Sequence, residues 1–324
     1  MNRHYNVITV GESTIDAFMT LAHANTSIQL DEKNKLLSFR HGEKIDVDRY
    51  DFTIGGNATN VAVGLTRLGL KATLCSETGD DEFSIKIRNC LASERIERLL
   101  VNQTHGASNF SVIINFKGDR TIFVQDAQRE HDFKLEDVTA DFIYLTSLGR
   151  DWVHPYEMVL DFVTKNKATK LAFNPGSRQL HEGKEIVRKI LKKSHMVFVN
   201  KEEAEMILTD KETENDERKY VEGLMAKIQK LGPRIVVLTN GKKGSHVLDD
   251  TGKFYWHGIN EGRVVERTGA GDAYTSGFLA ASLYGMSVPK AMKWGVHNAT
   301  SVVGQIGAQA GLLRKEEMES LMGK

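Results

Sequence analysis

Asp272 is the residue whose chemistry is easiest to infer from the sequence. It ends the run Gly269-Ala270-Gly271-Asp272 and precedes an apolar, helix-forming stretch. A loop of small residues that opens a helix leaves backbone N–H groups free at the positive end of the helix dipole, where they can hold an anion. A carboxylate beside a bound phosphoryl group is placed to take a proton from an attacking hydroxyl. We therefore predict that Asp272 is a general base and that the amides of Gly269, Ala270 and Gly271 form the anion site.

A simpler explanation is that Asp272 only caps the helix, since an Asp side chain often accepts a hydrogen bond from an orphan amide. Capping does not need small residues at the three preceding positions, whereas the close approach of a ligand to the backbone does. Taken alone, the run leaves both explanations open, because glycine-rich turns before helices are common in α/β proteins. A second motif favours the ligand site.

A second glycine pair precedes a helix near the N-terminus, where Gly55, Gly56 and Asn57 are followed by Asn60. Apolar residues then recur with helical spacing. The amides of Asn57 and Asn60 fall in the first turn and offer both donors and acceptors, which hydroxyl-rich ligands such as sugars require. We predict that Gly55, Gly56, Asn57 and Asn60 bind the substrate that accepts the phosphoryl group.

Together, these two segments resemble the signatures of the ribokinase, or PfkB-type carbohydrate kinase, family. Two shorter motifs stand between them in the expected order: residues 200–205 are similar to the family's Asn-x-x-Glu motif, and residues 239–244 are similar to its nucleotide loop. The resemblance covers nearly the whole chain. It implies an enzyme that uses ATP and Mg²⁺ to phosphorylate a hydroxyl group of a small molecule.

The resemblance also implies roles for residues that would otherwise be ordinary. Asp16, by itself a loop or capping residue, corresponds to an Asp that binds sugar hydroxyls. Glu203 corresponds to a residue of the Mg²⁺ environment, where it acts through water because Mg²⁺ keeps much of its hydration shell. The residues implied to contact the nucleotide are Asn200, Thr239, Gly241, Gly244 and Asn298.

Three of these assignments have structural alternatives. The spacing of Asn200 and Glu203 is also that of a capping box. Residues 239–244 could be only a turn between strands at 235–238 and 245–248. Asn298 lies on an expected helix, where an Asn is usually just solvated.

The sequence departs from the family in two places that bear on the cation and the acceptor. Glu266-Arg267 stand where relatives have Asp-Thr, in a region that helps to hold a potassium-like ion, so activation by a monovalent cation stays open. Residues 145–149 lack the acidic residue that helps ribokinases to bind ribose. We expect a ribose-, fructose- or keto-acid-sugar-like acceptor, with a nucleoside such as adenosine as the alternative.

Composition and motifs disfavour other classes of protein. Lys plus Arg equal Asp plus Glu at 43 each in 324 residues, which predicts neither a nucleic-acid surface nor a polybasic membrane anchor. No apolar run has the length of a membrane span, so we expect a cytosolic protein. Cys75 and Cys90 are expected to be free thiols. A sugar-binding regulator without catalytic activity is the least favoured function, because Asp272 and the glycine loop are present.

The order of elements predicts a doubly wound α/β fold. From about residue 130 onward, apolar strand candidates alternate with amphipathic helices, which is typical of a mostly parallel sheet flanked by helices. Ligands bind such sheets beyond the carboxyl ends of the strands, where Asn200 and residues 240–241 fall. The strands are expected at 142–145, 170–173, 196–199 and 235–239, and the helices at 155–164, 184–192 and 217–231.

Two stretches interrupt this alternation and predict a separate small β-sheet. We expect a core formed by residues 1–16, 54–105 and 126–324, the last of these with the nucleotide site, and a lid formed by residues 17–53 and 106–125. A small sheet has an apolar face and edges to bury. The lid is therefore expected to close over the acceptor and to pair between subunits in a homodimer.

Overall fold

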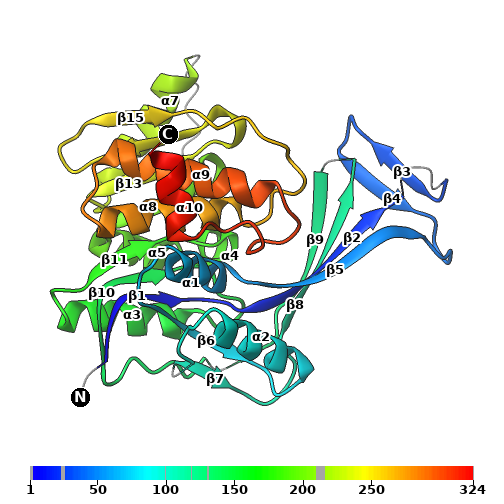
Figure 1. Cartoon of the computed structure of the whole chain (residues 1–324), viewed down its shortest axis with the longest axis horizontal. Coiled ribbons are helices and arrows are strands. Elements are labelled where there is room, and N and C mark those ends of the chain that lie inside the picture. The colour runs from blue at the N-terminus through cyan, green and yellow to red at the C-terminus, as the bar shows by residue number, and fades with distance from the viewer. Residues whose placement is uncertain are drawn as a thin grey trace.

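A long, mostly parallel sheet runs through the centre of the molecule (Figure 1). The computed structural model describes residues 3–22, 26–98, 100–117, 119–129, 131–208 and 216–323. Within these residues the sheet has nine strands, in the order β15-β14-β13-β12-β11-β10-β1-β6-β7. They are β1 (Arg3–Val10), β6 (Ala72–Thr78), β7 (Val101–Gln103), β10 (Val138–Leu145), β11 (Lys170–Phe173), β12 (Met196–Asn200), β13 (Ile235–Thr239), β14 (Ser245–Leu248) and β15 (Phe254–His257).

The strand order reverses direction at β1, which pairs in parallel with β10 on one side and with β6 on the other. Such a reversal leaves a crevice at the carboxyl ends of the strands, and ligands bind there in open α/β sheets. The two strands at the far edge are antiparallel: β13 pairs with β14, and β14 with β15. Residues 239–244 thus do join two antiparallel strands, through the short 3-10 helix η1 (Gly241–Lys243).

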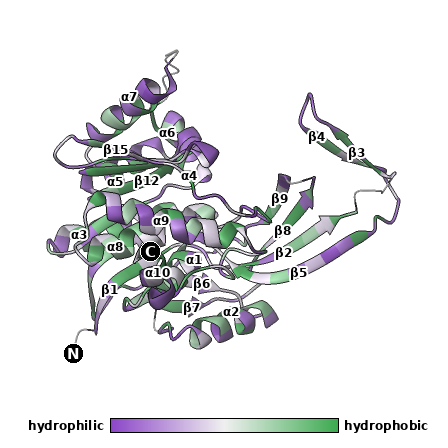
Figure 2. Ribbon diagram, turned by 45° about the horizontal axis from the view of Figure 1, so that its top comes forward, coloured by the Kyte–Doolittle hydropathy of each residue, from purple (hydrophilic) through white to green (hydrophobic). Residues whose placement is uncertain are grey.

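Helices cover both faces of this sheet because its strands are apolar on both sides. On β10, for example, Ile143 and Leu145 face one hydrophobic cluster, whereas Phe142 and Tyr144 face another. Figure 2 shows hydrophobic strands between helices that carry hydrophilic residues on their outer sides. The helices that cover the face of Ile143 are α3 (Val153–Lys165), α4 (Ser177–Glu182), α5 (Lys184–Lys193), α6 (Lys201–Leu208) and α7 (Glu217–Gln229). The helices that cover the face of Phe142 are α1 (Asn57–Arg67), α8 (Ala270–Leu283), α9 (Val288–Val303) and α10 (Lys315–Met322). Helix α2 (Glu82–Ser93) shares a smaller hydrophobic cluster with α1.

The predicted doubly wound fold is confirmed, and the expected strands and helices lie within a few residues of their predicted bounds. Cys75 and Cys90 are free, as predicted. None of the helices in the described ranges combines the length and the apolar character that a membrane span requires.

A smaller sheet, the lid, projects from one side of the core (Figure 1). Its strands lie in the order β5 (Val47–Gly55), β2 (Thr14–Leu21), β8 (Asn109–Phe116) and β9 (Asp119–Gln125), and β3 (Ile28–Asp31) and β4 (Leu36–Phe39) form a separate hairpin. The boundaries expected between residues 16 and 17 and between 53 and 54 fall inside β2 and β5. Both strands pair along their whole length within the lid sheet, so Asp16 lies on that sheet.

Arg67, the last residue of α1, ties this helix to two distant segments. Its guanidinium makes two bonds to the carboxylate of Glu94, at 2.6 and 3.1 Å, and donates to the carbonyls of Gln309 and Leu312 at 2.7 and 3.0 Å. The side chains of Arg67 and Glu94 are only 15% and 13% exposed. The contact therefore fixes the connection between α9 and α10 against α1.

We expect Arg67→Ala to lower the free energy of unfolding by about 2–4 kcal/mol, because it leaves a shielded carboxylate and two carbonyls without their donor. Urea unfolding measures this loss. Arg218→Ala is the control, since Arg218 makes an exposed ion pair with Glu222 that is worth roughly 0–1 kcal/mol. Equal losses of unfolding free energy in the two variants would show that the Arg67 contact stabilises the fold no more than an exposed ion pair does.

Candidate active site

The glycine loop before α8 has the geometry of an anion site. Gly269 is the N-cap of α8 with a φ of 79°, and a Cβ there would lie 2.3 Å from the Cβ of Ala308. Only glycine meets both conditions without strain. A Cβ on Gly271 would point into open space. A ligand can therefore approach the backbone at Gly271, on the side where the first turn of the helix presents its amides.

The predicted amides differ in their availability. The amide of Ala270 donates to the carbonyl of Arg267 at 3.3 Å. Within the described residues, the amides of Gly271 and Asp272 have no backbone acceptor. The amides of this first turn that are free for an anion are therefore those of Gly271 and Asp272.

The carboxylate of Asp272 is bonded to a side chain of another helix and does not cap its own. Asp272 is the third residue of α8 and is 8% exposed, and its Oδ2 accepts a hydrogen bond of 2.8 Å from Nδ2 of Asn60. The explanation of Asp272 as a plain N-cap is therefore wrong, because Gly269 is the cap and no side chain caps this helix. Burial raises the pKa of Asp272 to about 7, and the charges of Asp16 and Glu203 add to the effect.

Asn60 connects Asp272 to a residue that sequence reasoning missed. Its Oδ1 accepts a hydrogen bond of 3.0 Å from Nε2 of Gln309, while its Nδ2 donates to Asp272. Gln309 thereby fixes which end of the Asn60 amide faces the carboxylate. No local signal marks Gln309, since 249 residues separate it from Asn60.

The predicted acceptor residues come together where the lid meets the core. A Cβ on Gly55 would lie 2.0 Å from Oδ2 of Asp16, and a Cβ on Gly56 would lie 2.4 Å from the carbonyl oxygen of Glu12. Gly56 also has a φ of 91°. The glycine pair is therefore required by the packing of the strand that carries Asp16, and Asn57 and Asn60 follow directly in α1.

Asp16 lies on the lid face that looks toward this junction. Its Oδ1 accepts a hydrogen bond of 2.9 Å from the hydroxyl of Thr14. Burial raises the pKa of Asp16 to about 6, although bonds from Thr14 and Ser111 lower it and the charge of Glu266 raises it further. Thr14 and Ser111 are additional polar groups of the site, placed by the pairing of Asp16 with Ser111 across β2 and β8.

On the side of the predicted nucleotide site, Asn200 and Glu203 form the capping box that was the structural alternative. The amide of Glu203 donates to Oδ1 of Asn200 at 2.8 Å, and the amide of Asn200 donates to Oε2 of Glu203 at 3.0 Å. Burial raises the pKa of Glu203 to about 7, while its bonds to Asn200 and Asn174 lower it. The Nδ2 of Asn174 donates to the carbonyl of Phe198 at 2.8 Å, which holds this side chain beside the end of β12.

Thr239 and the two glycines that follow it lie at the carboxyl end of β13, the strand beside that of Asn200. Thr239 pairs with Asn200 on the neighbouring strand. Gly244 has a φ of 88°, and a Cβ there would lie 2.2 Å from the carbonyl oxygen of His257, so the hairpin itself needs this glycine. Gly241 has a φ of 51° and open space around its Cα. Of the two glycines, Gly241 thus has room for a ligand.

Asn298 is not the solvated helix residue that its type suggested. It is fully buried, and its Nδ2 donates to the carbonyl of Ala273 at 2.9 Å and to the hydroxyl of Ser276 at 3.1 Å. Its Oδ1 accepts from the amide of Leu313. The side chain thus links α9 to the helix that carries Asp272, and it acts as packing support for that helix.

The acidic groups of the site suit a hard cation held partly by other ligands. Burial raises the pKa of Asp16, Glu203 and Asp272, and the charges of Asp16 and Glu203 raise that of Asp272 further. A nearby positive charge would therefore stabilise the ionised forms of these groups. Within the described residues, no three His, Cys, Asp or Glu side chains gather as a metal site. This donor set fits Mg²⁺, which is usually bound by one or two carboxylates together with water and substrate phosphates.

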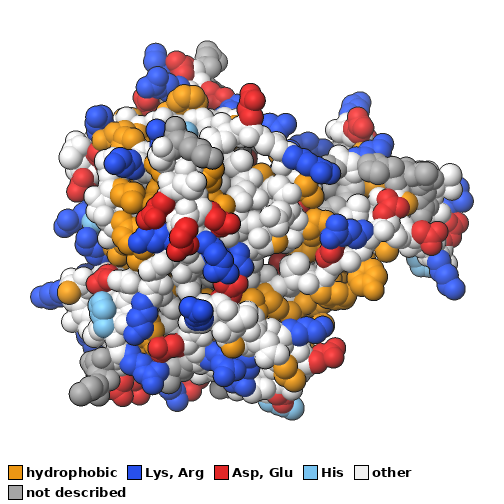
Figure 3. All heavy atoms as spheres, in the orientation of Figure 1, with side chains coloured by type: hydrophobic (Ala, Val, Ile, Leu, Met, Phe, Trp, Pro, Cys, Tyr) orange, Lys and Arg blue, Asp and Glu red, His pale blue; other side chains and the backbone are white. Residues whose placement is uncertain are grey.

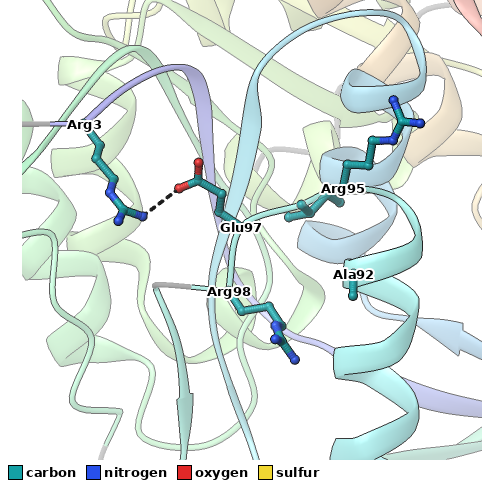
Figure 4. A pocket seen from close by; sticks show the side chains of 6 residues that line it. Arg3, Ala92, Arg95, Glu97 and Arg98 are labelled. Atoms are coloured by element: carbon teal, nitrogen blue, oxygen red, sulfur yellow. Dashed lines mark hydrogen bonds and ion pairs between the residues drawn. The ribbon is translucent and has the colours of Figure 1, made fainter.

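A shallow hollow of about 520 Å³ lies away from these residues, at the amino end of β1 (Figure 4). Arg3, Arg95 and Arg98 surround it, and Arg3 is paired with Glu97 at 3.0 Å. The residues described above lie at the carboxyl ends of the strands. The hollow is therefore separate from the candidate active site.

Comparison with known proteins identifies the family of the chain. The profile of the pfkB family carbohydrate kinases matches residues 18–315. The chain is 23% identical over 319 residues to the ATP-dependent 6-phosphofructokinase of Thermoanaerobacterium thermosaccharolyticum, covering 95% of this chain and 90% of the relative. It is 26% identical over 320 residues to the nucleoside kinase of Methanocaldococcus jannaschii, covering 94% and 93% of the two chains.

Solved structures match the fold along its whole length. The ribokinase of Thermotoga maritima superimposes with a TM-score of 0.77 at 19% identity, covering 99% of this chain and 100% of that one. The Arabidopsis thaliana ribokinase in complex with ribose and ATP gives a TM-score of 0.78 at 18% identity, covering 99% of both chains. The large sheet with its separate lid is therefore a ribokinase-like fold. By the extent of the family match, the chain belongs to the pfkB family of carbohydrate kinases, enzymes that transfer a phosphoryl group to an alcohol group.

Proposed function

We propose that the protein phosphorylates a hydroxyl group of a sugar with the γ-phosphoryl group of ATP. The observation that carries this proposal is the position of Asp272, a buried carboxylate one residue beyond Gly271, whose amide is free and whose surroundings are open. A base and an anion site so close together are what in-line transfer to a hydroxyl requires.

In the proposed reaction, the acceptor hydroxyl oxygen attacks the γ-phosphorus of ATP, and the bond from that phosphorus to the bridging oxygen breaks to release ADP. Asp272 takes the hydroxyl proton, for which its raised pKa suits it at neutral pH. The free first-turn amides of α8, those of Gly271 and Asp272, stabilise charge on the transferred group. Asn60, oriented by Gln309, keeps the carboxylate in place.

The acceptor is proposed to lie between α1 and the lid. Asp16 offers charge-assisted hydrogen bonds to its hydroxyls, and Asn57 and Asn60 offer amide donors and acceptors beside the glycine pair. Adenosine and similar nucleosides are the alternative acceptors, because they too present a polyol to the same groups. The nucleoside kinase among the relatives supports keeping this alternative.

A carboxylate from another part of the chain lies against the segment that lacks one of its own. The Oε1 of Glu12 is 2.9 Å from the position that a Cβ on Gly149 would take, and Nδ2 of Asn109 donates to this oxygen at 3.3 Å. Burial and the charge of Asp126 raise the pKa of Glu12 to about 7. A ribose-like acceptor is therefore compatible with residues 145–149, because Glu12 supplies the acidic group there.

The donor is proposed to be ATP with Mg²⁺. Glu203, through water, and Asn200 would face the metal and the phosphates, with Thr239, Gly241 and Gly244 along the nucleotide. Mg²⁺, when bound, neutralises charge on the donor phosphates. We expect weak dependence on potassium, since a fixed Arg contacts Glu266. An ATP-dependent reaction also fits the cytosolic location expected from the sequence.

Asp272→Asn should lower turnover by about 10²- to 10⁴-fold, because Asn has the same size but cannot take the proton. ADP release is measured with ribose, fructose, a keto-deoxy sugar acid and adenosine as acceptors, together with ATP affinity and thermal stability. Asp161→Asn, on the surface of α3, is the matched control and should keep full activity. Near-normal turnover of a folded Asp272→Asn variant would refute the assignment of the base.

The acceptor class with which the wild-type chain releases ADP decides whether its substrate is a sugar or a nucleoside. ADP release that depends on adenosine alone would replace the sugar proposal with the nucleoside alternative. A chain that binds a sugar but releases no ADP with any acceptor would support the regulator instead.

We also propose that the protein is a homodimer that pairs through the lid. Hydrophobic side chains of the lid are exposed, and Figure 3 shows a band of them along β5. Phe52 and Phe123 lie in one row across the sheet, joined by the pairings of Ala17 with Phe52 and Val112 with Phe123, and they are 52% and 55% exposed. Burying such side chains against a second copy removes apolar surface from water.

Sedimentation equilibrium at micromolar concentration should give the mass of a dimer, about twice 36.3 kDa. The double variant Phe52→Lys, Phe123→Lys should be monomeric, because it places charges on the proposed contact. Leu321→Lys, on an exposed position of α10, should stay dimeric. A monomeric wild-type protein would rule out the proposed dimer.

A further inference from the structure

The lid makes a direct contact with the loop that precedes the catalytic helix. Side chains alternate between the two faces of a strand, so Arg120, Ile122 and Val124 of β9 share one face. Val124 pairs with Ser111, and Ser111 pairs with Asp16. Arg120 therefore lies on the same face of the lid as the proposed acceptor residue Asp16.

From this face, Arg120 reaches Glu266. Its Nε lies 3.8 Å from Oε1 of Glu266, and the Glu266 side chain is only 3% exposed. The Nε of Arg120 is itself buried and has no hydrogen-bond partner among the described residues. Arg267, the cation next in the sequence, is exposed. The positive charge that meets the buried Glu266 carboxylate thus comes from the lid.

Glu266 in turn holds the start of the glycine loop. Its Oε2 accepts from the amide of Thr268 at 2.7 Å, and its Oε1 accepts from the hydroxyl of Thr268 at 2.8 Å. Thr268 is followed directly by Gly269, the N-cap of α8. A shift of the Glu266 carboxylate would therefore move the first residues of the loop that presents the amides.

The opposite edge of the lid sheet, β5, contacts the connection between α9 and α10, which in turn packs against Gly269. A Cβ on Gly307 would lie 2.8 Å from Cγ2 of Thr53 on β5, and the next residue, Ala308, packs against Gly269. This second contact is between the side chain of Thr53 and the backbone at Gly307, and it involves no charged group. Arg120 is what provides electrostatic compensation for Glu266 in its buried position.

We propose that Arg120 is a positioning residue for phosphoryl transfer: the lid places its guanidinium on Glu266 and so fixes Thr268 and the amides that follow. The proposal rests on the function proposed above. Because Arg120 and Asp16 share one face of one sheet, the lid position that brings Asp16 onto the acceptor also brings Arg120 onto Glu266. Acceptor binding and assembly of the anion site are thereby linked.

The test compares Arg120→Gln, which keeps much of the length but removes the charge, with Arg120→Lys. The control is Arg49→Gln, on β5 of the same lid, where Arg49 pairs with Asp51 at 2.6 Å. For Arg120→Gln we expect kcat to fall roughly 10- to 100-fold, as misplacement of a catalytic group does, with the KM values of acceptor and ATP little changed. Arg120→Lys should recover part of the loss, and Arg49→Gln should behave as wild type.

Two further measurements separate this role from a general effect on folding. Low concentrations of guanidinium should partly restore kcat to an Arg120→Ala variant. Adding Arg120→Gln to a Glu266→Gln variant should lower kcat much less than adding it to the wild-type chain, because the two side chains act through one contact. An unchanged kcat in Arg120→Gln, or an equal loss in Arg49→Gln, would overturn the proposal.

Amide hydrogen exchange tests the contact without any reaction. Arg120→Gln should speed exchange of the amides from Thr268 to Asp272, and Arg49→Gln should not. Unchanged exchange in Arg120→Gln would overturn the proposal even if kcat fell. A wild-type chain that shows this exchange difference but transfers no phosphoryl group would instead count against the proposed function.

Discussion

The structure has to bury three carboxyl groups, two of which are near enough for their charges to act on the third. Burial raises the pKa of Asp16, Glu203 and Asp272, and Asp272 also feels the charges of the other two. Each group has hydrogen-bond donors fixed by a different part of the fold: Thr14 on the lid, Asn200 at the end of β12, and Asn60 at the start of α1. The negative charge of these carboxylates suits a reaction that brings phosphates together with a cation, because the cation offsets the charge of both the phosphates and the carboxylates.

The rest of the fold holds these hydrogen-bond donors in fixed positions. The reversal of strand order at β1 opens the crevice into which the carboxyl ends of the strands point. Helices α1 and α8 pack against each other on one face of the sheet, which brings Asn60 to Asp272. Behind them, Arg67 holds the segment that carries Gln309, and Gln309 holds Asn60. A contact far from the chemistry thereby controls the orientation of one amide in the site.

Much of this arrangement could be predicted from the sequence because its signals are local. The glycine loop before Asp272, the glycine pair before Asn57 and the alternation of strands and helices each depend on neighbouring residues. The contacts of Gln309 with Asn60 and of Arg120 with Glu266 depend on segments that meet only after folding, so spacing gave no sign of them. The same is true of Asn298, whose polar side chain is buried because two segments distant in the sequence, α8 and the connection between α9 and α10, supply its partners. The lid bounds expected at residues 16–17 and 53–54 fall within β2 and β5, which pair with each other along their whole length in the lid sheet.

The pH dependence of kcat/KM, measured for the wild-type chain and for Asn60→Leu, tests the role of Asp272 most directly. This quantity reports the ionisation of the free enzyme, and a base must be ionised to act. For wild type, kcat/KM should fall as the pH drops through about 7, where Asp272 takes up its proton. Asn60→Leu removes the hydrogen bond that lowers this pKa, so the fall should move to higher pH. A fall near the ordinary Asp value of 3.8, or one that Asn60→Leu leaves in place, would contradict catalysis by a buried Asp272.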